Sequence, residues 1–341
     1  MESSIWLWIA FNIFVLALLA FDLGVLHRKE REIKVAEAMK LSLMYIVLAL
    51  IFGAGLFWLR GHQDGIDFLT GYFIEKSLSV DNIFVIVLIF SYFQVPPQHQ
   101  HRVLFWGILG ALVMRGILIF AGVKLIHEFA WMALIFGAFL IVTGVKMLVV
   151  ADEKPDLEDN IIVKAVRSRF RLTDRFHGKH FFVRQEGALY VTPLFLVLVL
   201  IEVTDLIFAV DSIPAIIAIT TDPFIVYTSN VFAILGLRAL YFALAGIVPR
   251  FVYLKYGLSL VLLVIGFKMI ANYLYGGKFI PTEWALLMTV ILIGGSIILS
   301  LIKTRGQLSE GETLPTGWIP GSGVKEEDEA ESAKQKQPDE K

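Results

Sequence analysis

The sequence contains no cysteine. This absence excludes disulfide bonds, thiolate metal sites and any thiol redox chemistry of the chain's own. Charged residues are also scarce, at 18% of the 341 residues where soluble domains carry about 25%. Lys and Arg number 30 against 31 Asp and Glu, so the chain lacks the basic surplus of a nucleic-acid-binding protein. Soluble and nucleic-acid-binding classes are therefore excluded first.

The chain has long apolar runs instead. Hydrophobic residues make up 57% of it, and segments such as Ser42–Trp58 and Leu286–Ile302 carry no charge. About 20 apolar residues span a bilayer as a helix. The sequence therefore predicts an all-α, polytopic membrane helix bundle of about nine spans. We expect these at residues 5–26, 41–59, 68–93, 103–123, 129–150, 190–218, 225–247, 251–274 and 283–302.

Composition also divides the chain. Residues 1–303 form the expected transmembrane domain, and residues 304–341 are expected to be a disordered acidic tail, because charged and small residues replace the apolar ones. The hydrophilic connector 151–187 is predicted to be cytoplasmic, with an amphipathic helix near Ile161–Phe170. Loops expected inside hold 17 Lys and Arg against 3 outside, which predicts an outer N-terminus and a cytoplasmic C-terminus.

Two segments of the chain resemble each other. Glu75 and Asp81 are six residues apart with Val before the second acid, and Asp205 and Asp211 repeat that pattern. Arg115 and Arg238 follow downstream, and then Gly144-Val-Lys-Met and Gly266-Phe-Lys-Met. The units, about 68–150 and 190–274, hold three spans each, so they should lie in opposite orientations. Inverted repeats are typical of transporters with a midplane site.

Acidic side chains within the spans outnumber basic ones. A charge facing lipid at the midplane costs about 2.5–3.5 kcal/mol or more, so these groups must face protein or water. The surplus favours a bound cation, although ion pairs that only hold helices together, or protonated acids, remain alternatives. The acids are Asp22, Glu75, Asp81, Glu202, Asp205 and Asp211, and the deep bases are Lys76, Arg115 and Arg238.

Helix geometry bears on how these acids meet. Acids six residues apart lie about 120° apart around a continuous helix. They would converge if the helix were interrupted, and Pro214 is expected to kink or break the sixth span. In the other copy, Ser77, Ser79 and Asn82 are polar and would tolerate unwinding, with Asn82 adding a carbonyl ligand.

The predicted ligands are all oxygen atoms, which suit Mg²⁺, Ca²⁺ and Mn²⁺. The seven histidines fall in or beside loops by this interpretation, which makes zinc, copper or iron poorer substrates. Oxygen ligands alone do not separate Mn²⁺ from Mg²⁺ or Ca²⁺. We expect no cofactor and no enzymatic activity.

These residues resemble the TerC family of bacterial integral membrane proteins, and in particular its Alx-like branch. The resemblance covers nearly the whole chain to about residue 303. It is carried by Phe21-Asp-Leu, by Thr70-Gly-Tyr leading into Glu75-Lys-Ser-Leu-Ser-Val-Asp-Asn, by His180-Phe-Phe-Val-Arg, by Asp205-Leu-Ile-Phe-Ala-Val-Asp-Ser-Ile-Pro-Ala, by Thr221-Asp-Pro-Phe and by Phe232-Ala-Ile-Leu-Gly-Leu-Arg.

The resemblance implies membership in the wider LysE-like transporter group, an inner-membrane location, and a role in metal-ion homeostasis, chiefly Mn²⁺ export. It also implies a historical link to tellurite resistance, and similar members are described as membrane redox modulators. The leading hypothesis is export of a divalent cation, with Asp22, Glu75, Asp81, Asn82, Glu202, Asp205 and Asp211 as ligands or proton carriers and Arg115 and Arg238 pairing with the acids of the empty site. The alternative is a non-transporting stress-response protein that acts through partners, whose identity the sequence does not give.

Overall fold

The computed structural model describes residues 5–21, 35–149, 161–173, 175–185, 187–245, 251–276 and 280–304. Predictions about Asp22, about residues 150–160 of the connector and about residues 305–341 of the tail therefore fall outside the described residues.

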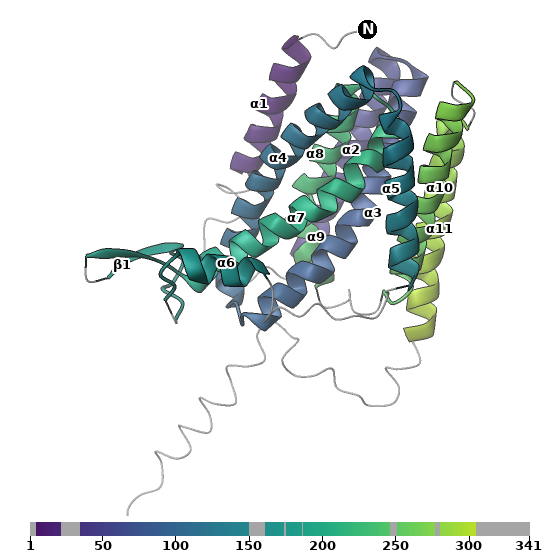
Figure 1. Ribbon diagram of the computed structural model, residues 1–341. Coiled ribbons are helices and arrows are strands. Elements are labelled where there is room, and N and C mark those ends of the chain that lie inside the picture. Colours follow the sequence, from purple (N-terminus) through teal and green to yellow (C-terminus); the bar gives the residue numbers. More distant parts are fainter. Residues whose placement is uncertain are drawn as a thin grey trace, which may run out of the picture.

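Helices dominate the fold, and they run mostly side by side as a bundle (Figure 1). The only strands among the described residues form one antiparallel hairpin. The elements are α1 (Ile5–Phe21), α2 (Val35–Leu59), α3 (His62–Tyr92), α4 (Pro97–Glu128), α5 (Met132–Val149), α6 (Ile161–Arg169), β1 (Phe182–Gln185), β2 (Ala188–Val191), α7 (Pro193–Ile217), α8 (Pro223–Leu235), α9 (Leu237–Leu244), α10 (Leu254–Leu274) and α11 (Thr282–Thr304).

Each of the nine expected spans coincides with a helix, and the seventh is divided into α8 and α9. Within the described ranges, seven helical stretches are long and apolar enough to cross a membrane, with α8 and α9 counted as one. α1 is shorter at 17 residues, and α3 carries several acids along its 31 residues. The all-α polytopic class is confirmed. The exact span count and the inverted repeat remain predictions.

Several helices begin where the sequence has a starting signal. Proline occupies the first turn of α4, α7 and α8, where its missing N–H costs no intrahelical hydrogen bond. Asp222 additionally caps α8, because its carboxylate accepts hydrogen bonds from the backbone N–H groups of Phe224 and Ile225.

The expected break at Pro214 is wrong. Pro214 lies inside α7, which continues to Ile217. It sits in the last turn, where its missing N–H costs one intrahelical hydrogen bond, to the carbonyl of Val210. α3 is also continuous, because Ser77 and Ser79 donate hydrogen bonds back to the carbonyls of Phe73 and Glu75 and are thereby accommodated within the helix.

A helix of the second predicted repeat does break, but at Gly236, between α8 and α9. A Cβ atom at this position would lie 2.7 Å from Nζ of Lys76 and 3.3 Å from Cβ of Tyr45. Close approach rather than backbone angle therefore favours glycine here, because Tyr45 of α2 and Lys76 of α3 both lie against this point of the chain.

The helices differ in how much protein surrounds them. α8 and α9 are almost wholly buried, whereas α2, α5 and α11 leave most of their apolar surface on the outside of the bundle. Figure 1 shows α10 and α11 together on one flank beside α5, and α1 on the opposite flank. The centre, which α3, α4, α7 and α8 share, is where buried polar groups can avoid lipid.

α5 and α10 approach each other through small residues at two levels. A Cβ atom at Gly137 would lie 3.0 Å from the carbonyl oxygen of Gly266, and Ser259 donates a hydrogen bond to the carbonyl of Gly144. The predicted repeat aligns Gly144 with Gly266, and therefore Gly137 with Ser259. The symmetry that relates the two units would convert the Gly137–Gly266 contact into the Ser259–Gly144 contact. The presence of both contacts supports the predicted repeat.

An ionic cluster joins helices at the end of the bundle predicted to face outward. Arg60 lies 2.8 Å from Asp64 through Nε and 2.5 Å from Asp222 through Nη2. Its guanidinium also lies over the ring of Phe224, 5.7 Å from the centroid. Since Asp222 caps α8, the cluster ties the corner between α2 and α3 to the start of α8.

Replacing Gly266 by Val should destabilise the bundle. The new Cβ atom would lie 2.8 Å from the carbonyl oxygen of Gly137, so α5 and α10 must separate. Overpacking of this kind costs about 1–3 kcal/mol. Thermal unfolding of the detergent-purified chain should shift down by several degrees. The same substitution at Gly294, where an added Cβ meets open space, is the control. Equal shifts in the two variants would contradict the close contact.

Candidate functional site

Arg115 of α4 lies at the centre of the bundle and binds acids from both predicted repeats. It forms a two-point pair with Asp205 of α7, at 3.0 Å from Nε to Oδ2 and 2.7 Å from Nη2 to Oδ1. Its Nη1 also donates to Oε1 of Glu75 on α3. The Arg115 side chain is 2% exposed and that of Glu75 is 1% exposed. One buried cation thus holds together α3, α4 and α7.

Two carboxylates share this one guanidinium, so the trio carries a formal charge of −1 when both acids are ionised. The planar guanidinium suits two-point binding of a carboxylate, and only one of its edges is used by Asp205. Glu75 takes the remaining Nη1, which also lies 3.4 Å from the hydroxyl oxygen of Ser212. The arginine is fully engaged, but the acids are not.

Several oxygen atoms around this trio lack partners. Asn82 donates from Nδ2 to Oδ1 of Asp205 at 3.3 Å, which leaves its own carbonyl oxygen free. Among the described residues, no hydrogen-bond partner is found for the buried oxygens Glu75 Oε2, Asn82 Oδ1 and Glu202 Oε2. Buried polar atoms are almost always satisfied, so these three oxygens are the candidates for binding a further group.

A small cavity adjoins Asp205. It measures about 20 Å³, is bounded by α3, α4, α7 and α9, and has Asn82, Thr204 and Asp205 as its polar lining. A cavity needs about 10–15 Å³ to hold one water molecule, so this one has room for one water or one small ion. Its apolar lining includes Ile86 of α3 and Leu104 of α4. Both lie between the trio and the helix ends that are predicted to face inward.

Glu202 lies one turn before Asp205 on α7, as the sequence predicts for acids three residues apart. Its carboxylate rests directly against Gly110 of α4, where any Cβ atom would overlap it. Gly110 is therefore small because an acid occupies the space beside it.

The second acid of each pair lies apart from the trio. Asp81 is partly buried on α3, and within the described part of the chain no hydrogen bond or ion pair holds it. Asp211 of α7 accepts a hydrogen bond from the Thr143 hydroxyl of α5 at 3.3 Å, and the positive charge of Lys146 attracts its carboxylate. Because α3 and α7 are continuous, each pair keeps its separation of about 120°.

The other two deep cations take different positions from Arg115. Lys76 does not pair with an acid among the described residues. It donates to the carbonyl of Ala233 at 3.3 Å, next to the break at Gly236. Arg238 is buried near the start of α9, two residues after that break. In this structure Arg115 therefore pairs with acids, whereas Lys76 binds backbone.

Sequence analysis did not single out Asn230 of α8, whose amide nitrogen and oxygen are both buried and without a partner among the described residues. Val226, one turn earlier, packs in a cluster with Ile119 of α4. Tyr241 of α9 bonds to Gln100 of α4, so the two helical paths run antiparallel. This register places Asn230 at the level of Arg115. Its signal was an amide inside an otherwise apolar span.

In the described structure the guanidinium of Arg115 balances part of the charge of Glu75 and Asp205. Within the described ranges, no group of three or more His, Asp or Glu side chains is arranged to hold a metal ion. Asp22 lies outside those ranges. The arrangement can nevertheless exchange charge, because a divalent cation beside Asp205 and Glu75 would compete directly with the guanidinium of Arg115.

Replacing Arg115 by Gln should destabilise the protein far more than replacing Glu75 by Gln. The first change leaves two buried acids without a cation, which costs about 3–5 kcal/mol. The second leaves the two-point Arg115–Asp205 pair and removes the excess negative charge. Thermal unfolding in detergent compares the variants. If Glu75→Gln proved as damaging as Arg115→Gln, Glu75 rather than Arg115 would organise the centre.

Comparisons with known proteins agree with this architecture. Residues 60–308 match the model of the integral membrane protein TerC family. A membrane protein of Myxococcus xanthus, named STKORF319, is 51% identical over 300 residues, which cover 88% of this chain and 93% of that protein. The "Putative membrane-bound redox modulator Alx" of Escherichia coli K12 is 50% identical over 273 residues, 77% of this chain and 85% of that protein.

A membrane protein of Rickettsia felis is 45% identical over 296 residues, which cover 87% of this chain and 97% of that protein. No solved structure matches the chain. The family match covers most of the chain, including the segments that hold Glu75, Arg115 and Asp205. This chain belongs to the TerC family of integral membrane proteins.

Proposed function

We propose that this protein is an inner-membrane secondary transporter that exports divalent cations, with Mn²⁺ as the favoured substrate. One observation carries the proposal: at the buried centre, Glu75 and Asp205 share a single arginine and are surrounded by oxygen atoms without partners. A group that only fixed helix packing would need neither the surplus acid nor the unsatisfied oxygens.

The donor set supports a hard cation as substrate. Carboxylates of Glu75, Asp205 and Glu202, with the amide oxygen of Asn82, are the ligands that Mg²⁺, Ca²⁺ and Mn²⁺ prefer. The cavity beside Asp205 has room for one such ion. The preference for Mn²⁺ among these three rests on the family resemblance rather than on the ligands.

In this proposal Arg115 holds the ion-free state. When a cation enters beside Asp205, the carboxylates turn from the guanidinium to the metal, and Asp81, Asp211 and Asp22 complete its coordination as the helices move. When the cation leaves, Arg115 again neutralises Glu75 and Asp205. Protons taken up by the remaining acids would couple export to the proton gradient.

The competing function is that of a stress-response protein that transports nothing, and relatives carry the name of a redox modulator. A redox role in this chain would have to proceed without thiols, since it has no cysteine. It would require a bound redox group, which an absorption spectrum of the purified protein would reveal.

Replacing Asp81 or Asp211 by Ala should abolish cation transport while the protein still inserts and folds. Neither acid is bound to Arg115, so their loss leaves the central trio intact. The purified chain is reconstituted into liposomes that contain a dye sensitive to Mn²⁺, and the initial rates are compared. Glu128→Gln, which alters an exposed acid at the end of α4, is the control.

Undiminished rates in both aspartate variants would refute their assignment as ligands. A wild-type protein that moved no Mn²⁺, Mg²⁺ or Ca²⁺ would favour the non-transporting alternative.

Replacing Asn230 by Ala should also slow transport, by about tenfold or more if its amide contacts the ion or the acids only during the cycle. Its matched control is Ser229→Ala on the adjacent residue, because the Ser229 hydroxyl donates a hydrogen bond to the Val226 carbonyl of its own helix. The same liposome assay measures both. Equal effects of the two variants would show that packing, not the amide, matters at this position.

A further inference from the structure

α6 and the hairpin of β1 and β2 extend sideways from the end of the bundle opposite the N-terminus (Figure 1). α6 is held there by Val163 and Val166, which are buried in one cluster with Leu196 of α7. Residues 171–173 run beside β2, as backbone bonds link Thr173 N–H to Val191 O and Val191 N–H to Arg171 O. The segment is thus a folded unit fixed to the membrane-crossing helices.

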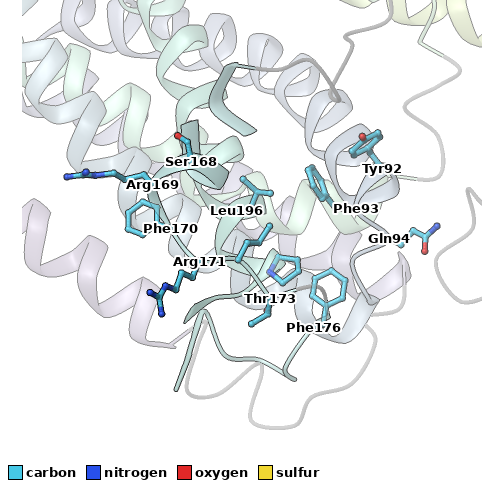
Figure 2. Close-up of a pocket in the computed structure, with 12 residues that line it drawn as sticks. Tyr92, Phe93, Gln94, Ser168, Arg169, Phe170, Arg171, Thr173, Phe176 and Leu196 are labelled. Atoms are coloured by element: carbon cyan, nitrogen blue, oxygen red, sulfur yellow. The ribbon is translucent and has the colours of Figure 1, made fainter. Parts of the chain in front are cut away.

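Between this unit and the end of α3 lies an open concavity of about 1140 Å³ (Figure 2). Tyr92, Phe93 and Gln94 line it from the α3 side, and Arg169, Arg171 and Phe176 from the other. Figure 2 shows Phe93 and Phe176 on one side, with Arg169 and Arg171 extending at the opposite rim. Its lining thus includes aromatic side chains and two exposed arginines whose side chains extend outward at the rim, and it lies where α3 ends and α7 begins.

The unit as a whole is basic and partly apolar on its outer surface. Residues 161–191 contain seven Lys and Arg against two Asp and Glu. Three large apolar side chains, Phe170, Phe182 and Leu189, are 46%, 48% and 65% exposed. Exposed aromatic residues mixed with basic ones are typical of protein surfaces that lie at the level of lipid headgroups.

The direction in which the unit extends indicates which kind of partner binds it. A docking surface for a soluble partner would point away from the membrane, along the helices. This unit instead extends sideways beside the end of the bundle (Figure 1), and it carries the exposed side chains of Phe170, Phe182 and Leu189. The occupant must therefore be at the membrane surface and must be complementary to arginine.

We propose that the concavity between the end of α3 and the lining residues 168–173 and Phe176 binds the headgroup of an anionic phospholipid. Arg169 and Arg171 contact the phosphate, because guanidinium groups bind phosphate oxygens at two points. Phe93 and Phe176 contact the glycerol and the first methylenes of the chains. The site lies on the side that the charge distribution predicts to be cytoplasmic, where anionic lipids attract basic segments. The proposal does not depend on transport.

The test compares two double variants that remove the same charge from the same unit. Arg169→Gln with Arg171→Gln alters the lining, whereas Arg175→Gln with Arg184→Gln alters exposed arginines outside it. The full-length chain is delipidated in detergent and supplied with phosphatidylglycerol or phosphatidylcholine. Retained lipid is counted by native mass spectrometry, and thermal unfolding is followed in parallel.

Wild type should retain phosphatidylglycerol about tenfold or more in preference to phosphatidylcholine and unfold at a higher temperature with it. The lining variant should lose both effects, and the control variant should keep them. Equal losses in the two variants would show a diffuse attraction and overturn the site. So would a wild type that does not distinguish the two lipids. Soluble glycerol phosphate that reproduced the whole effect would show that free phosphate, rather than lipid, is the ligand.

Discussion

The structure depends on a single buried arginine that has to neutralise acids from two different helices. Arg115 pairs with Asp205 through two nitrogen atoms and with Glu75 through a third. In a low-dielectric centre a carboxylate is favoured beside a positive charge, so this cation helps to hold α3 and α7 against α4, in addition to the apolar contacts among these helices. The charge balance of the trio is nevertheless incomplete, and this makes the centre a place where a second cation would be favoured.

The helices of the bundle contact each other in two ways, through close backbone packing and through charged side chains. α5 and α10 meet through Gly137, Gly144, Ser259 and Gly266, with backbone against backbone, and such contacts leave no room for sliding. The centre is different, since its helices contact one another through charged side chains that can exchange partners. The helix break at Gly236 lies beside Lys76 and two residues before Arg238. Backbone polar groups at this break therefore lie next to two of the deep cations.

Much of the fold could be predicted because lipid imposes strong rules on sequence. Apolar runs gave every helix of the bundle, and the cost of a buried charge directed attention to Glu75, Asp205 and Arg115 before their contacts were known. Which group each buried cation binds could not be predicted in this way. Lys76 and Arg115 are both cations within spans, yet Lys76 reaches a backbone carbonyl because its helix face meets α8 at the break. Pro214 does not end α7, because in the last turn a proline removes a single hydrogen bond to the preceding turn. Asn230 carries no charge, so the cost of a buried charge does not point to it.

The two ends of the bundle are not equivalent in this conformation. Toward the predicted outer end, Arg60 links Asp64 to the cap of α8 at Asp222, and Phe224 lies under the guanidinium. On the predicted inner side of Arg115, the cavity beside Asp205 lies between α3, α4, α7 and α9. An ion that entered from the inside would therefore reach Asp205 first, and it would meet Arg115 as the barrier to going further. If the guanidinium must release Glu75 and Asp205 before an ion can bind them, then the same event that binds the ion also frees α3, α4 and α7 from one another. A single exchange of partners would then couple occupancy of the site to movement of the helices around it.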